Sequence, residues 1–94
     1  MLKVVSRRTI KPEHLEKVIK MYEKMIDETR KEKGCISYEF FQDVNETNTI
    51  AMIEEWENQD CFDAHAQTSH FKEIVPQITE LQESSELRIF RKLR

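Results

Sequence analysis

The sequence predicts one α+β domain in which strands and helices follow each other in the order β-α-β-β-α-β. Two observations support this fold class. Residues 15–29 repeat their apolar side chains at the three- and four-residue spacing of an amphipathic helix, whereas four other segments alternate in polarity or are rich in β-branched and aromatic residues. The chain of 94 residues is long enough for one domain and too short for two, so residues 1–94 are expected to share a single core.

The first strand is expected at residues 2–10, and a long helix should follow it. Pro12 fits the first turn of a helix, where the missing N–H is not needed. The end of the helix is expected at residues 31–34, because lysines favour the C-terminal dipole and Gly34 can act as a cap. The apolar stripe of this helix consists of Leu15, Val18, Ile19, Tyr22, Met25, Ile26 and Thr29.

The second half of the chain predicts a hairpin, two short helices and a last strand. Strands at 35–43 and 49–57 flank a polar turn at 44–48. Asn58 can cap a helix to about residue 67, and Thr68 or Ser69 can cap another, which Pro76 should end or kink. The last strand is expected at residues 86–93. This order is the split βαβ arrangement of ferredoxin-like folds with an antiparallel sheet.

Apolar residues on both faces of the predicted strands indicate that the protein is a homodimer. In the second strand, strict alternation places Ile36, Tyr38 and Phe40 on one face and Cys35 and Phe41 on the other. The helices can cover only one face of the sheet, so a second copy of the chain is the natural cover for the other. The alternative is that these side chains are scattered surface hydrophobes, which are normal when they occur singly.

Composition favours a cytoplasmic protein that binds neither nucleic acid nor membranes. The formal net charge is −3, whereas nucleic-acid binding usually needs a basic face. No apolar run approaches the roughly 20 residues that cross a bilayer. The first eight residues alternate like a strand and lack the apolar block of a signal peptide. Cys35 and Cys61 form no CxxC pair and are expected to be reduced thiols.

Histidine and cysteine spacing gives little support for a metal site. On a continuous helix His65 and His70 would be separated by about 140°, so they could share an ion only if the helix were broken between them. Cys61 and His65 share a helix face, but two ligands without a third are a weak signal. We therefore expect no metal and no other cofactor. A Cys61–His65 nucleophile pair lacks an orienting third group, so packing of Cys61 is the simpler interpretation.

A pocket between the sheet and the helices is the more promising candidate site. His65 lies on the inward stripe of its helix, where apolar surroundings would lower its pKa and keep the imidazole neutral and basic. Glu54 and Trp56 share one strand face. A general base with aromatic walls would suit a flat organic substrate that can lose a proton. The alternative is purely structural: a satisfied core histidine, a Glu54 that pairs with an arginine, and a Trp56 that fills the core.

Three motifs resemble those of the antibiotic biosynthesis monooxygenase (ABM) family, and the resemblance extends over essentially the whole chain. The motifs are Gly34-Cys35-x-x-Tyr38, Glu54-x-Trp56, and His65 followed by His70-Phe71. The resemblance implies a dimeric α+β barrel, formed by two sheets that pack face to face. The resemblance specifies the fold more closely than it specifies an activity, because one fold can host several activities.

Members of the resembled family include oxygenases of quinols and polyphenols that need no metal or flavin, haem degraders, and an isomerase of a phosphorylated autoinducer-2 product. The resemblance implies that His65 transfers protons, with Glu54 and Trp56 as further catalytic residues. Haem degradation is disfavoured, because the position of the axial histidine holds Val75, which cannot bind iron. The expected substrate-binding residues are Tyr38, Phe40, Met52, Phe62 and Phe71.

The predicted function is therefore cofactor-independent monooxygenation of a small quinol or phenolic substrate. In such a reaction the substrate is its own electron donor, and a base such as His65 produces the electron-rich anion that reacts with O₂. Two alternatives stay open. One is a ligand-binding or stress-associated barrel without catalysis, and the other is an isomerase that moves a proton next to a carbonyl without oxygen.

Overall fold

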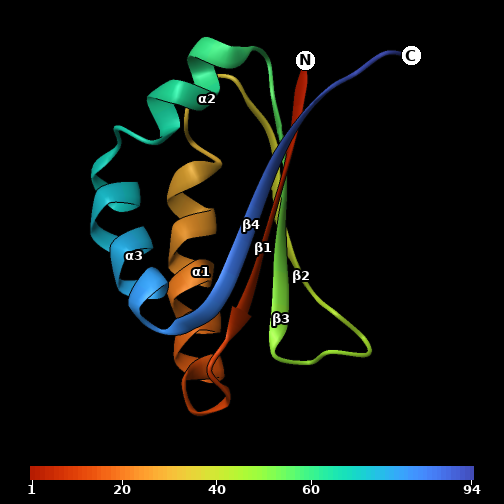
Figure 1. Cartoon of the computed structure of the whole chain (residues 1–94). Helices are drawn as coiled ribbons and strands as arrows, with labels where there is room; N and C mark the ends of the chain where they lie inside the picture. Colours follow the sequence, from red (N-terminus) through yellow and green to blue (C-terminus); the bar gives the residue numbers. More distant parts are fainter.

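A computed structural model describes all residues from Met1 to Arg94 and confirms the predicted α+β fold (Figure 1). Four antiparallel strands form one sheet in the order β2-β3-β1-β4, and the helices lie against one face of it. The elements are β1 (Leu2–Ile10), the 3-10 turn η1 (Pro12–His14), α1 (Leu15–Thr29), β2 (Cys35–Gln42), β3 (Thr49–Trp56), α2 (Gln59–His65), α3 (Ser69–Glu80) and β4 (Gln82–Arg91). No helix has the length and apolar character needed to span a membrane.

The core lies between the helices and the inner side of β1 and β3. Side chains alternate along these central strands, so that every second residue faces the helices. Five of the seven residues in the stripe predicted for α1 are buried against them, whereas Leu15 and Ile19 are half-buried, and Ile74 and Ile78 of α3 are buried on the same side. Three polar side chains share this inner row with the apolar ones: the buried Ser6 on β1 and Glu54 on β3, and the half-buried Arg8 on β1. The buried apolar residues are Val4, Ile10, Val18, Tyr22, Met25, Ile26, Tyr38, Ile50, Met52, Trp56, Ile74 and Ile78.

A β-bulge at the start of β2 changes which of its residues face inward. Cys35 pairs with Trp56 and Ser37 pairs with the adjacent Glu55, so Ile36 is an extra residue without a partner. Because of it, Cys35 packs against the core while Ile36 is exposed. The expectation that Ile36 shares a face with Tyr38 is therefore wrong: strict alternation does not hold across a bulge.

The two short helices begin where the sequence predicts, with a break between them. Asn58 caps α2 by accepting a hydrogen bond from the backbone N–H of Cys61, and Thr68 caps α3 by accepting one from the N–H of Phe71. Pro76 does not end α3, which continues to Glu80. Burial of Ile74 and Ile78 on either side of the proline holds that helix against the sheet.

Gly34 allows the loop after α1 to pass close to α2. Its φ of 80° lies in the left-handed region that favours glycine. A Cβ at this position would come within 2.3 Å of the Cys61 Sγ, so a larger residue would push the loop away. This close approach positions the segment that carries Glu32 against the C-terminal end of α2.

The outer face of the sheet carries no helix (Figure 1). Phe41 on β2 and Phe90 on β4 are 49% and 48% exposed there, and Ile36 is also exposed. Charged side chains lie among them, including the ion pair of Lys3 with Glu55 and that of Arg7 with Glu86. The single chain thus leaves both apolar and charged groups open on this face.

Candidate functional site

A cavity lies between the inner side of the sheet and the helices. Its volume is about 90 Å³. It reaches the surface beside Leu87 of β4, which lines it and is exposed. Of the eight predicted site residues, six line it: Tyr38, Met52, Glu54, Phe62, His65 and Phe71. The other lining residues are Ser6, Arg8, Tyr22, Ala66, Val75 and Leu87.

Larger hollows occur on the outer side of the sheet, but they are less suited to chemistry. Hollows of about 240 Å³ and 320 Å³ are lined mainly by charged residues of β1 and β4. Neither contains a histidine or a buried carboxylate, and charged groups in contact with bulk water are strongly screened. The smaller inner cavity is therefore the candidate active site.

His65 is enclosed by aromatic rings at the inner end of this cavity. It is 2% exposed, and its ring centroid lies 4.9 Å from that of Trp56, 5.1 Å from Phe71 and 5.5 Å from Tyr38. Burial disfavours the charged imidazolium and lowers the pKa of His65 below its ordinary value, against the raising effect of nearby Glu32. A neutral imidazole that can accept a proton is the expected state at neutral pH.

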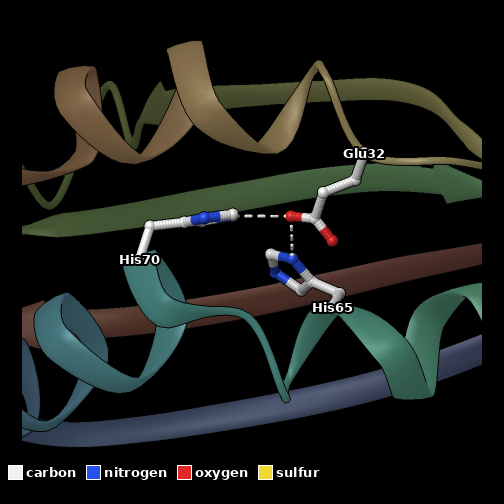
Figure 2. Close-up of side chains that lie close together, drawn as sticks. All are labelled: Glu32, His65 and His70. Atoms are coloured by element: carbon white, nitrogen blue, oxygen red, sulfur yellow. Dashed lines mark hydrogen bonds and ion pairs between the residues drawn. The ribbon is translucent and has the colours of Figure 1, made fainter.

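Glu32 orients this imidazole (Figure 2). Its Oε2 atom lies 2.8 Å from Nδ1 of His65 and 2.7 Å from Nε2 of His70. Because an ionised carboxylate can only accept hydrogen bonds, both nitrogens must carry their protons toward it. In a neutral His65 the proton therefore sits on Nδ1, and Nε2 keeps its lone pair. This is the arrangement by which a carboxylate prepares a histidine to act as a general base.

The break between α2 and α3 brings the two histidines together. His65 is the last residue of α2, and His70 is the second residue of α3. Thr68, between them, donates a hydrogen bond to the His65 carbonyl at 2.8 Å and lies 3.2 Å from the His70 Nε2. The helix is thus broken between His65 and His70, which is what the sequence analysis required for the two side chains to converge.

Glu32 and Arg8 are site residues that the sequence analysis missed. Glu32 follows α1 in a turn and has no spacing that sets it apart from the other acidic residues. The nearest signal is Gly34 two residues later, which marks a close approach of the chain. Arg8 lies in β1, where polar residues occur on both faces of the strand, so the sequence pattern did not set it apart.

Glu54 is a buried carboxyl group at the wall of the cavity. Its Oε1 accepts a hydrogen bond of 2.9 Å from the Trp56 indole N–H. Burial raises the pKa of Glu54 to about 7, although the Trp56 hydrogen bond lowers it, and the negative charge of Glu32 adds to the rise. Near neutral pH this group can therefore either donate or accept a proton.

Two of the predicted site residues do not line the cavity. Trp56 is fully buried, so its contacts are with Glu54 and His65 and not with a ligand in the cavity. Phe40 instead stacks on Tyr22 of α1, with ring centroids 5.9 Å apart. Alternation correctly placed both on the inner side of the sheet, but it could not tell which inner side chains border the hollow.

Glu32, His65 and His70 are also the only group of side chains whose ligand atoms lie close enough to hold a metal ion, all within 4.8 Å of one another. Two imidazoles and a carboxylate could bind a divalent cation. Metal ligands at about 2.0–2.1 Å from a tetrahedral ion stand roughly 3.3 Å apart, whereas these contacts of 2.7 and 2.8 Å are hydrogen-bond lengths. The geometry is therefore that of a hydrogen-bonded relay.

Neither cysteine is placed as a nucleophile. Burial, with help from the negative charge of Glu32, raises the pKa of the Cys35 thiol to about 11, which suppresses the reactive thiolate. Cys61 packs against the core and lies close to Gly34. The chemistry available at the site is thus proton transfer by His65 and Glu54 between aromatic walls.

Fold and cavity together define a small ferredoxin-like α+β protein with a cavity between its sheet and its helices, lined by a buried histidine and a buried carboxyl group. Residues 1–77 match the family model described as antibiotic biosynthesis monooxygenase, and the chain belongs to this ABM family. The match includes every residue of the Glu32–His65–His70 cluster and the strands that carry Glu54 and Trp56.

Several relatives and solved structures are similar to the chain over most of its length. An uncharacterised Synechocystis protein is 35% identical over 94% of this chain, which spans only 60% of that relative's length. The Bacillus subtilis protein named "Putative monooxygenase YcnE" is 32% identical over 77% of this chain and 76% of its own length. A crystal structure described as an antibiotic biosynthesis monooxygenase matches all of both chains with a TM-score of 0.95 and 32% identity. A conserved Methanosarcina mazei protein matches 97% of this chain and 91% of its own, with a TM-score of 0.94 and 35% identity.

Proposed function

We propose that this protein is a monooxygenase that acts on a small quinol or phenolic substrate without a cofactor, with His65 as the proton-transfer residue. The observation that carries the proposal is the Glu32–His65 hydrogen bond, which directs the Nδ1 proton away and leaves Nε2 free at a cavity with aromatic walls. The family described as antibiotic biosynthesis monooxygenase supports the oxygenase class.

In the proposed reaction the substrate supplies all the electrons that reduce O₂. The Nε2 of His65 removes a phenolic proton, and the resulting anion transfers one electron to O₂. The two radicals combine to form a C–O bond, and cleavage of the O–O bond releases water. For a simple quinol the balance is C₆H₆O₂ + O₂ → C₆H₄O₃ + H₂O, in which the ring gains one oxygen atom and loses four electrons.

Glu54 is proposed as the second proton-transfer group. With a pKa of about 7, it can hold a proton at the cavity wall and donate it to an oxygen atom that becomes negative during the reaction. Trp56 is a positioning residue in this scheme, because its indole N–H fixes one oxygen of Glu54. Tyr38, Phe62, Phe71 and Met52 would hold the ring and exclude water.

The pairing of a neutral imidazole with a carboxyl of pKa near 7 also favours a second candidate, a proton-transfer isomerase. One group would remove a proton next to a carbonyl while the other returns a proton at a neighbouring atom. Such a reaction consumes no O₂, so turnover under argon identifies it.

The open sheet face supports a homodimer in which two copies cover each other's exposed strands. Phe41, Phe90 and Ile36 would leave water on association, at a gain of about 25 cal/mol per Å² of buried apolar surface. The mixed charges around them can form pairs with a second copy of the same face. A chain this small also gains from a second subunit because it buries a limited fraction of its own surface.

Oxygen consumption with a panel of quinols tests the proposed function. Monooxygenation uses one O₂ per substrate and forms water, whereas simple autoxidation forms H₂O₂, which added catalase would reveal by returning half of the oxygen. Incorporation of one ¹⁸O atom from ¹⁸O₂ into the product is expected. The His65→Ala variant should lose activity on the order of 10²–10⁴-fold, and His14→Ala, at a half-buried position that does not line the cavity, should serve as the matched control. Full activity in His65→Ala would overturn the mechanism.

A further inference from the structure

Arg8 is a cation at the wall of the cavity that has no anionic partner. It lies on the inner row of β1, opposite Ile50 of β3, and lines the cavity together with His65. None of the ion pairs in the structure includes Arg8, although the chain is acidic overall. Glu54, the only carboxylate among the lining residues, accepts its hydrogen bond from Trp56 instead.

The guanidinium group of Arg8 is held by polar side chains but has no anion beside it. Its Nη1 donates hydrogen bonds to the Thr79 Oγ1 near the end of α3, at 3.3 Å, and to the Gln82 Oε1 at the start of β4. Its Nε is buried and has no hydrogen-bond partner. A buried donor without a partner is rare, and a charged one is especially costly, so an acceptor is expected here.

Arg8 and His65 lie toward opposite ends of the cavity. Leu2, six residues before Arg8 on β1, pairs with Trp56, whose ring contacts His65. Arg8 also lies beside Tyr22: burial raises the pKa of the Tyr22 hydroxyl, and both the positive charge of Arg8 and a hydrogen bond from it oppose that rise. A ligand that fills the space between them would meet a base at one end and a cation at the other.

We propose that Arg8 binds a carboxylate, or a comparable oxyanion, of the substrate, so that the protein selects small aromatic acids over neutral quinols. Nη1 is fixed by Thr79 and Gln82, and Arg8 is the only arginine or lysine that lines the cavity, so its planar guanidinium is the group there that can match the geometry of a carboxylate. The inference deepens the proposed function by assigning a charge to the substrate, and it rests on that function only for the reaction at the ring.

Two probes that differ in one group test this selection: 2,5-dihydroxybenzoate and 1,4-dihydroxybenzene. Calorimetric titration under argon measures binding without turnover. For the natural protein we expect the carboxylate probe to bind about 10- to 100-fold more tightly, as for hydrogen bonds to charged groups. In Arg8→Met the ratio of the two dissociation constants should fall to about 1 while the affinity for 1,4-dihydroxybenzene changes little. Arg8→Lys should keep part of the preference.

Arg7→Met is the matched control, because Arg7 is the residue before Arg8 on β1 and lies on the exposed outer face beside Glu86. It should keep the full preference for the carboxylate probe. Equal binding of the two probes to the natural protein, an unchanged ratio in Arg8→Met, or no binding of either probe at millimolar concentration would overturn the proposal. An equal loss of both probes in Arg8→Met, with the same thermal unfolding midpoint, would also overturn it.

Failure of this inference is separable from failure of the proposed function. If the preference depends on Arg8 but no quinol consumes O₂, the anion site stands and the oxygenase proposal falls. If quinols are oxygenated in a His65-dependent way and the carboxylate probe binds no more tightly than the neutral one, the oxygenase proposal stands and the anion site falls. The binding measurement contains no oxygen, and the oxygen measurement can be made with either probe.

Discussion

Glu32 accepts a hydrogen bond from Nδ1 of His65 at 2.8 Å, although the two residues are 33 positions apart in the chain. The same carboxylate oxygen accepts from His70, 38 positions away. The Oε2 atom of Glu32 thus determines which ring nitrogen carries a proton in both His65 and His70. Of the two, only His65 lines the cavity. This contact determines which nitrogen of His65 is available to a substrate.

Replacing Glu32 with Gln should lower kcat strongly while leaving the fold intact. Glutamine can turn its NH₂ group toward His65, which would favour the tautomer with the proton on Nε2 and remove the base. By analogy with other carboxylate–histidine pairs, we expect a loss on the order of 10²–10⁴-fold. Steady-state kinetics gives the loss, and ¹⁵N chemical shifts of the imidazole give the tautomer. An unchanged tautomer together with full activity would contradict the proposed role.

The activity should depend on pH through both groups at the cavity. It should rise as pH increases through the depressed pKa of His65, because the base must be neutral, and fall as Glu54 loses its proton near pH 7. Glu54→Gln keeps a neutral donor at this position, so the alkaline limb should disappear while the acid limb stays. A pH profile of kcat/KM for both proteins measures this. An alkaline limb that survives the substitution would assign it to another group.

Glu54 should also make the protein less stable at alkaline pH. Its pKa is raised from the ordinary 4.5 to about 7 in the folded state, so the folded protein binds a proton more tightly than the unfolded chain between these values. The free energy of unfolding should therefore fall as pH rises from about 4.5 to 7, by an amount on the order of 3 kcal/mol. Urea unfolding at pH 5 and pH 8 checks this. Relative to the natural protein, Glu54→Gln should gain stability at pH 8 only.

Gly34→Ala should destabilise the protein and also reduce catalysis. The new Cβ would lie 2.3 Å from the Cys61 Sγ at a φ of 80°, so both a clash and backbone strain are introduced. A cost of about 2–4 kcal/mol in unfolding free energy is expected. Movement of the loop would shift Glu32 away from His65 and lower kcat. Adding Cys61→Ala should restore part of the stability, because the nearest clashing atom is removed.

The proposed dimer predicts a specific response to charge on the open sheet face. Phe41→Glu should shift the protein from dimer to monomer, because an unpaired carboxylate would be buried between the sheets. Val44→Glu is the control, since Val44 is even more exposed but lies in the turn between β2 and β3. Sedimentation velocity at micromolar concentration distinguishes the two species. A monomeric natural protein would refute the dimer.

The sequence was sufficient to predict the order of the elements, because hydrophobic spacing and capping residues are local properties. The stripe from Leu15 to Thr29 and the caps at Asn58 and Thr68 all lie as expected. The bulge at Ile36 was missed because alternation alone does not reveal an extra residue. The last strand also begins earlier than expected, at Gln82 instead of residue 86, since its polar start pairs through the backbone with Ile10 and Thr9.

The candidate site was predictable only in part. His65 could be placed on an inward helix face because the spacing from Cys61 is local, and Glu54 shares a strand face with Trp56 for the same reason. Glu32 and Arg8 depend on contacts between distant segments. Glu32 reaches the site because the loop at Gly34 packs against α2, and Arg8 is oriented by the contact of β1 with the end of α3. Neither contact produces a regular residue spacing that could be recognised in the sequence.

The interrupted helix between His65 and His70 has a consequence for how the protein acquires its chemistry. The Glu32 carboxylate, the two imidazoles and the Glu54 carboxyl come from the loop after α1, from the junction of α2 and α3, and from β3, so the site forms only when these separate segments pack together. In a nascent or truncated polypeptide without these contacts, His65 would be solvated and would lack Glu32 beside it. Recovery of turnover during refolding would thus mark the moment when these distant segments have docked.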